Sequence, residues 1–150
     1  MSMKQHFIID KDDFGMAGEA SSTVKRTLTK LGAPPPIIKR VAIAMYEAEI
    51  NAFIHGGGGE AQAEIDDEKI SIIVKDQGKG IADLDLAMQE GWSTADEEVR
   101  RMGFGAGMGL PNIEKNTDEL EIITGPGIGT EVRMTINLHK QKEKERGNES

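Results

Sequence analysis

The run of residues that begins at Ile37 and ends before Gly56 constrains the fold of this 150-residue chain more than any other segment. Its apolar residues recur at intervals of three and four, which is the period of one face of a helix. About five turns pass without an interrupting glycine or proline. This segment is therefore the strongest predicted helix. The three prolines before it, at positions 34–36, are predicted to form a rigid, extended link.

Shorter patterns on both sides of this helix indicate a small α+β fold. A second helix is predicted over Met16–Leu31, because its apolar residues have helical spacing and Gly32 follows as a stop. Short apolar or alternating runs between turn residues predict strands. The predicted strands are His6–Ile9, Gln62–Ile65, Ile70–Val74, Leu120–Ile123 and Glu131–Leu138, and the predicted short helices are Leu84–Met88 and Leu110–Asn116. This order groups the helices on one face, so we expect a two-layer α+β sandwich with a mixed, mainly antiparallel sheet.

Composition limits the size and the surroundings of this fold. With 37% hydrophobic and 29% charged residues, the chain is expected to form one domain over residues 1–138, followed by a charged, disordered tail over 139–150. No apolar run approaches the roughly 18–20 residues of a membrane span, and no signal-peptide pattern is present. The lack of cysteine fits a reducing cytoplasm. A net charge of −8 argues against nucleic-acid partners and against a membrane surface.

Glu47 and Asn51 are the first candidate functional pair. They are four residues apart on the long helix, so they share one face. An asparagine carbonyl is a hard oxygen ligand suited to Mg²⁺, and a carboxylate one turn away can accept a proton. Taken alone, such a pair is usually a solvated polar stripe. His55 is expected to cap or pack and not to catalyse, and Glu49 lies on another face of the helix.

The segment Asp76-Gln-Gly-Lys-Gly-Ile81 follows a predicted strand directly. A carboxylate at the end of a strand can accept a hydrogen bond from the adenine amino group, whereas guanine presents a carbonyl there. Gly78 and Gly80 would let the backbone approach the base and the sugar closely. An ordinary glycine turn is the alternative.

Two later glycine-rich segments complete the set. Glycine occupies every second position from Gly103 to Gly109, just before a predicted helix, and such a junction suits phosphate. A flexible hinge is the alternative. Neither a Walker motif nor a dinucleotide-binding motif fits these glycines. The segment Gly125–Thr130 connects the last two strands as a tight turn, and Thr130 could hydrogen-bond near the base.

The order of these motifs along residues 36–138 resembles the N, G1, G2 and G3 boxes of the GHKL ATPases, which have the Bergerat ATP-binding fold. Within that superfamily the chain looks like the bacterial switch-protein kinases and anti-sigma factors of the RsbT, RsbW and SpoIIAB kind. The stretches that carry this resemblance are Glu47–Gly56, Ala87–Thr94 and Gly107–Ile113, and the last two favour the RsbT type.

The resemblance implies a protein that uses ATP and Mg²⁺ to phosphorylate a serine of a partner STAS-domain protein. By position, Glu47 would be the general base, Asn51 the magnesium ligand and Asp76 the adenine acceptor. Ser93, Thr94 and Arg101 would lie in a lid. The nucleotide-binding set that the resemblance implies is Asn51, Asp76, Gly78, Gly80, Ile81, Ser93, Thr94, Arg101, Gly103, Gly105, Gly107, Met108, Gly109, Leu110 and Thr130.

Two other functions stay open at this point. The first is a binding module that captures a sigma factor or another regulator in the presence of ATP, with no need for chemistry. The general base implied at Glu47 favours the kinase, since a pure binder has no use for one. The second is a detached histidine-kinase catalytic domain, which lacks dimerisation helices and a phosphoacceptor histidine here. A homodimer is also left open.

Overall fold

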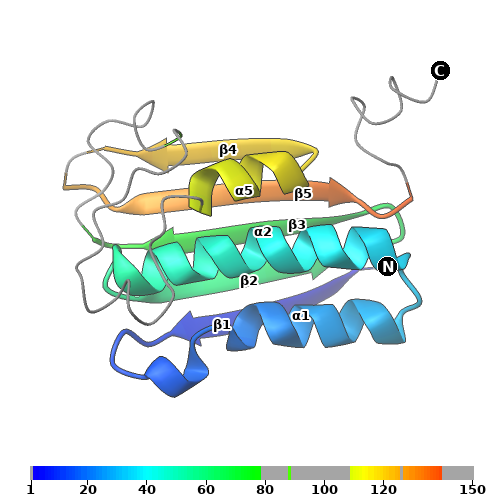
Figure 1. Ribbon diagram of the computed structural model, residues 1–150, viewed down its shortest axis with the longest axis horizontal. Coiled ribbons are helices and arrows are strands. Elements are labelled where there is room, and N and C mark those ends of the chain that lie inside the picture. Colours follow the sequence, from blue (N-terminus) through cyan, green and yellow to red (C-terminus); the bar gives the residue numbers. More distant parts are fainter. Residues whose placement is uncertain (1, 79–87, 89–108, 126, 140–150) are drawn as a thin grey trace.

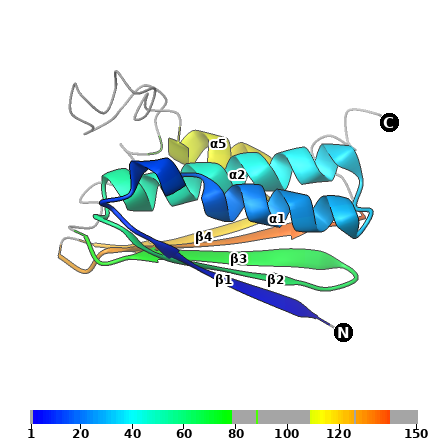
Figure 2. The ribbon, with the colours of Figure 1, turned by 90° about the horizontal axis from the view of Figure 1, so that it is seen from below.

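The computed structural model describes residues 2–78, 88, 109–125 and 127–139 of the chain. In these residues a five-stranded sheet lies under a layer of helices (Figures 1 and 2). The elements are β1 (Met3–Ile9), the 3-10 helix η1 (Phe14–Met16), α1 (Glu19–Lys30), α2 (Pro35–Ile54), β2 (Gly59–Ile65), β3 (Lys69–Asp76), α5 (Gly109–Asn116), β4 (Glu119–Thr124) and β5 (Thr130–Asn137). The expected two-layer α+β sandwich is confirmed.

The strands of the sheet are arranged in the order β1-β2-β3-β5-β4. Every neighbouring pair of described strands is antiparallel, whereas the sequence predicted a mixed, mainly antiparallel sheet. The connection through α1 and α2 explains the first pair: one helix takes the chain back along the sheet and the other returns it (Figure 1). β2 therefore starts beside the end of β1, with Gly59 paired to Ile9.

The helices cover one face of the sheet, and the core lies between the two layers (Figure 2). α2 is the middle helix and packs against α1 on one side and α5 on the other. Alternate residues of the central strands point into this core, as the period of two requires. The largest fully buried side chains are Val24, Leu28, Val41, Met45, Ile70, Ile72, Ile113, Met134 and Ile136.

The start of α2 differs from the prediction. Pro34 is extended, at φ −60° and ψ 133°, but Pro35 and Pro36 form the first turn of the helix and are not part of an extended link. The first helical residues have no intrahelical acceptor for their N–H groups, and proline φ is already close to the helical value. Proline therefore costs little in this turn. Among the described helices, none is both long enough and apolar enough to cross a membrane.

Several other predictions concern residues that the structure does not describe. The short helix predicted at Leu84–Met88 is outside the described residues except for Met88. Of the predicted tail, only His139 is described, and its Nε2 lies 2.6 Å from the carbonyl oxygen of Asp67. The helix predicted at Leu110–Asn116 is confirmed, one residue longer at its start.

Candidate functional site

Glu47 and Asn51 lie on the face of α2 that packs against α5. Gly109, the first residue of α5, meets both of them: a Cβ atom at this position would lie 3.3 Å from Oε2 of Glu47 and 3.4 Å from both terminal atoms of Asn51. A side chain at position 109 would therefore be in direct contact with the ends of both polar side chains. The structure therefore brings together three residues that the sequence had placed in the candidate site from segments more than 50 positions apart.

The carboxyl group of Glu47 is half-buried, and burial raises its pKa. A hydrogen bond from the side chain of Asn112 acts in the opposite direction, because it favours the ionised form. Asn112 was not among the predicted site residues. Its position three residues after Gly109 was the available signal, since that spacing places both on one face of a helix.

The sequence had indicated that Asp76 begins the loop after the strand. In the structure Asp76 is instead the last residue of β3. Its Oδ1 accepts hydrogen bonds from the backbone N–H of Gly78 at 2.9 Å and of Thr130 at 3.1 Å. Burial raises the pKa of this carboxyl, while the two hydrogen bonds and the nearby His55 oppose the shift. The two backbone bonds fix the carboxylate at the end of β3, the central strand of the sheet.

Glycines allow this fixed carboxylate to pack closely against the turn after α2. A Cβ atom on Gly56 would overlap Asp76, 2.3 Å from its Cγ, and one on Gly78 would lie 2.7 Å from the Cα of Gly56. Gly129 has φ +76°, and a Cβ there would lie 2.4 Å from the carbonyl oxygen of Asp76. The close approach seen at Gly78 is thus between two segments of backbone. A close approach of Gly78 to the adenine base stays a prediction.

The remaining described candidates, Thr130 and Leu110, differ in their surroundings: the first is hydrogen-bonded and the second is packed in the core. The Oγ1 of Thr130 lies 2.9 Å from that of Thr124, and the backbone N–H of Thr130 donates to Asp76. Leu110 is buried in the core. His55 is the C-cap of α2, as its expected capping role requires, and burial lowers its pKa. Nine candidates lie outside the described residues: Gly80, Ile81, Ser93, Thr94, Arg101, Gly103, Gly105, Gly107 and Met108.

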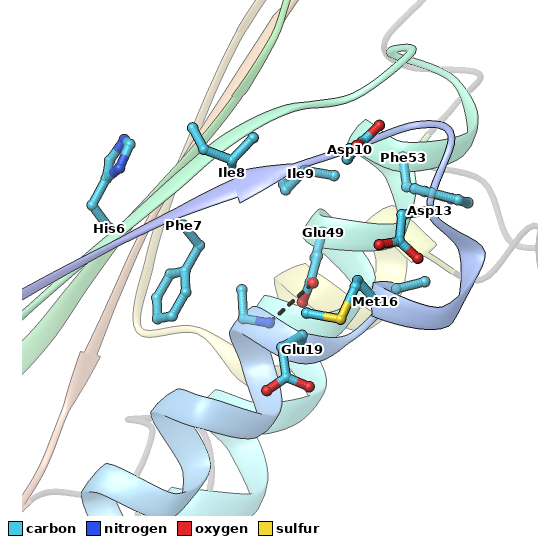
Figure 3. Close-up of a pocket in the computed structure, with 12 residues that line it drawn as sticks. His6, Phe7, Ile8, Ile9, Asp10, Asp13, Met16, Glu19, Glu49 and Phe53 are labelled. Atoms are coloured by element: carbon cyan, nitrogen blue, oxygen red, sulfur yellow. Dashed lines mark hydrogen bonds between the residues drawn. The ribbon is translucent and has the colours of Figure 1, made fainter.

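The opposite face of α2 has a structural role. Glu49 is only 3% exposed, and its carboxylate accepts hydrogen bonds from the backbone N–H groups of Gly18, Ala20 and Ser21 at 3.0–3.2 Å. It therefore caps the start of α1, where these donors have no helical partner. A cavity of about 460 Å³ lies beside it, lined by β1, η1, α1 and α2 (Figure 3). Glu49 and Phe53 line this cavity, while Glu47 and Asn51 face the other way.

The residue types at the α2–α5 junction fit a magnesium nucleotide. Mg²⁺ commonly takes one or two protein oxygens together with phosphate oxygens and water, so a single amide oxygen such as that of Asn51 is a sufficient protein contribution. Gly109 leaves the space beside this amide free of a side chain. Asp76, fixed by two backbone bonds, presents a hydrogen-bond acceptor at the end of β3.

The fold and the site together define a class of nucleotide-binding domain. Its helices cover one face of an antiparallel sheet, and its polar residues lie on α2 and at the end of β3. The chain belongs to the histidine kinase-like ATPase domain family, whose model matches residues 15–136. This family confirms the resemblance to the GHKL ATPases and implies that the protein binds ATP.

Curated relatives of this chain include anti-sigma F factors. The anti-sigma F factor of Thermoanaerobacter sp. is 43% identical over 115 residues, which cover 71% of this chain and 77% of the relative. That of Oceanobacillus iheyensis is 33% identical over 129 residues, which cover 82% of this chain and 85% of the relative. The finer preference for the RsbT type receives no support from these names.

A solved structure confirms the fold. The RsbU and RsbW domains of a Mycobacterium tuberculosis protein match with a TM-score of 0.62 at 20% identity. The match covers 93% of this chain but only 33% of that longer chain. At this identity the likeness shows the fold alone.

Proposed function

We propose that this protein is an ATP- and Mg²⁺-dependent serine kinase that phosphorylates a partner STAS-domain protein in a bacterial partner-switching pathway in the cytoplasm. The observation that supports this most is the position of Glu47. Its carboxylate is half-buried, lies one turn from Asn51, and faces the first residue of α5. A protein that only binds a partner needs no base at this place.

Phosphoryl transfer is catalysed mainly by positioning and by stabilising charge, with a base that accepts the proton of the attacking hydroxyl. Glu47 would accept the proton of the substrate serine, and burial makes its carboxylate a stronger base by raising its pKa. Asn51 would hold Mg²⁺, and this ion would neutralise charge on the phosphates when it is bound. Asp76 would accept a hydrogen bond from the adenine amino group. Roles for Gly80 and for the other eight candidates outside the described residues stay predictions.

A second candidate function is an anti-sigma factor that sequesters a sigma factor when ATP is bound, without obligatory catalysis. The names of the relatives favour it, since proteins 43% and 33% identical to this chain are called anti-sigma F factors. The two functions are compatible in one protein. Oligomeric state does not separate them, and a homodimer fits either.

The deciding experiment uses the full chain, ATP labelled at the γ-phosphate, Mg²⁺ and purified STAS-domain proteins encoded near it. Label on a serine of one STAS domain is the expected result. A complex with a sigma factor that depends on ATP, without transfer of label to any STAS domain, would support the second function and contradict the first.

A further inference from the structure

Three polar residues form a row across neighbouring strands at one end of the sheet (Figure 1). Asp76 of β3 is paired with Thr130 of β5, which is paired in turn with Thr124 of β4. Side chains of directly paired residues point to the same face of a sheet, and every second residue of a strand shares that face. Val74 and Val132, the next residues on this face, are buried in the core under the helices. The row therefore lies on the helix-covered face, at the strand ends that carry the candidate site.

Hydrogen bonds connect the row from β3 to β4. Oδ1 of Asp76 accepts from the backbone N–H of Thr130 at 3.1 Å. Oγ1 of Thr130 lies 2.9 Å from Oγ1 of Thr124, and the hydroxyl of Thr124 also donates to the carbonyl oxygen of Gly129 at 3.0 Å. Asp76, Thr124 and Thr130 are each partly exposed.

The number of protons decides the direction of the bond between the two threonines. A hydroxyl has one proton to donate, whereas a carbonyl oxygen can only accept. The proton of Thr124 is used in the bond to Gly129. The contact between the two hydroxyl groups then requires the proton of Thr130. Thr130 is left with lone pairs only for any other partner.

We propose that Thr124 is a positioning residue for the nucleotide base, because it holds Thr130 as a group that can only accept beside Asp76. The proposal rests on the proposed function, in which Asp76 accepts a hydrogen bond from the adenine amino group. That amino group has two protons, so it can donate to Asp76 and, directly or through one water, to Thr130. A purine with a carbonyl in this place presents an acceptor to two acceptors. Thr124 thus contributes to the selection of a 6-amino over a 6-oxo purine without contacting the base.

The first test compares Thr124→Val with Thr135→Val in calorimetric titrations of the full chain with Mg²⁺ and either ATP or inosine triphosphate. The two nucleotides have the same phosphates and differ in the base, which carries a 6-carbonyl in inosine. In Thr124→Val the proton of Thr130 is released and can turn toward the base. We expect the preference for ATP over inosine triphosphate to fall about 3- to 10-fold, because one hydrogen bond changes direction.

Two variants serve as controls for this titration. Thr135 lies between the buried Met134 and Ile136, so its side chain is on the other face of the sheet. Thr135→Val should therefore keep the wild-type preference. Thr124→Ser retains the hydroxyl and should keep it too, whereas Thr124→Ala should act like Thr124→Val and serves if valine impairs folding.

A second measurement needs no nucleotide. NMR of the labelled full chain reports how fast the hydroxyl proton of Thr130 exchanges with solvent, and a proton held in a hydrogen bond exchanges slowly. We expect faster exchange in Thr124→Val and wild-type exchange in Thr124→Ser and Thr135→Val. Exchange that is unchanged in Thr124→Val would show that Thr130 does not donate to Thr124, and would overturn the proposal.

The remaining outcomes separate this proposal from the function on which it rests. An unchanged preference in Thr124→Val would overturn the proposal. An equal loss of affinity for both nucleotides would overturn it as well, because Thr124 would then only support the turn between β4 and β5. Equal binding of the two nucleotides by the wild type would instead refute the assignment of Asp76 to adenine, and the exchange of the Thr130 proton would still decide whether Thr124 holds it.

Discussion

Glu47 and Asp76 are half-buried acids, and burial raises the pKa of both carboxyl groups. The folded state therefore keeps these protons to a higher pH than the unfolded chain does. Its free energy of unfolding falls as pH rises from the ordinary pKa of each group through the folded value. These residues cost stability at neutral pH, which is common for groups retained for function.

The first prediction follows for Glu47→Gln. Glutamine carries no charge, so the variant should be slightly more stable than the wild type at neutral pH, and the gain should be small because solvent screens a half-buried site. Below the ordinary pKa of glutamate the two proteins should be equally stable. Urea denaturation at the two pH values measures this, and a less stable variant at neutral pH would contradict the account of Glu47.

The second prediction concerns Asp76→Asn. The amide oxygen can still accept from Gly78 and Thr130, so the fold should be retained. The charge-assisted bond to adenine is lost, and the affinity for ATP should fall by about 1.5–3 kcal/mol. Asp66→Asn is a matched control, because Asp66 also accepts two backbone hydrogen bonds, but in the turn between β2 and β3. Wild-type protein that binds ATP and GTP equally in calorimetry would refute the assignment of Asp76.

At the scale of elements, α1 depends on a residue of α2. Glu49 accepts three backbone hydrogen bonds at the start of α1. Glu49→Gln turns an amide group toward these donors, and we expect a loss of about 1.5–3 kcal/mol of unfolding free energy with little change in ATP affinity. The exposed Glu64 of β2 provides the control Glu64→Gln, which should be neutral. A neutral result for Glu49→Gln in urea denaturation would show that the cap does not stabilise α1.

The turn between α2 and β2 gives a second test at this scale. Gly56→Ala places a Cβ atom on Asp76, so it should lower the affinity for ATP at least as much as Asp76→Asn does. Gly57→Ala is the control: its Cβ meets nothing within 4 Å, but φ is +71°. This strain should cost about 1–2 kcal/mol of stability and leave ATP affinity unchanged. Equal ATP affinities of the two variants, measured by calorimetry, would contradict the packing of Gly56 on Asp76.

At the scale of the whole molecule, local pattern predicted most of the fold. The helical period of α2, the apolar run of β3 and the alternation in β5 all reflect burial, and each can be seen within a single segment of the sequence. The roles of Glu49 and Gly56 were not predictable in the same way. Each depends on a contact with a distant segment, α1 in one case and Asp76 in the other. The start of α2 was missed because proline, usually a helix breaker, is compatible with the first turn.

In the candidate site, too, some features could be predicted from single segments and others could not. The residue types of Glu47, Asn51 and Asp76 indicated their chemistry, and helical spacing placed the first two on one face. The bond between Glu47 and Asn112 could not be predicted, because it requires the packing of α5 on α2 to be known.

The central claim is that Glu47 acts in chemistry and Asn51 in binding, and single-turnover phosphate transfer to the STAS partner tests it most directly. Glu47→Gln should bind Mg-ATP nearly as well as the wild type and transfer phosphate about 10²–10⁴-fold more slowly. Asn51→Ala should instead weaken Mg-ATP binding itself, because it removes the metal ligand. Transfer by Glu47→Gln at the wild-type rate would contradict the account.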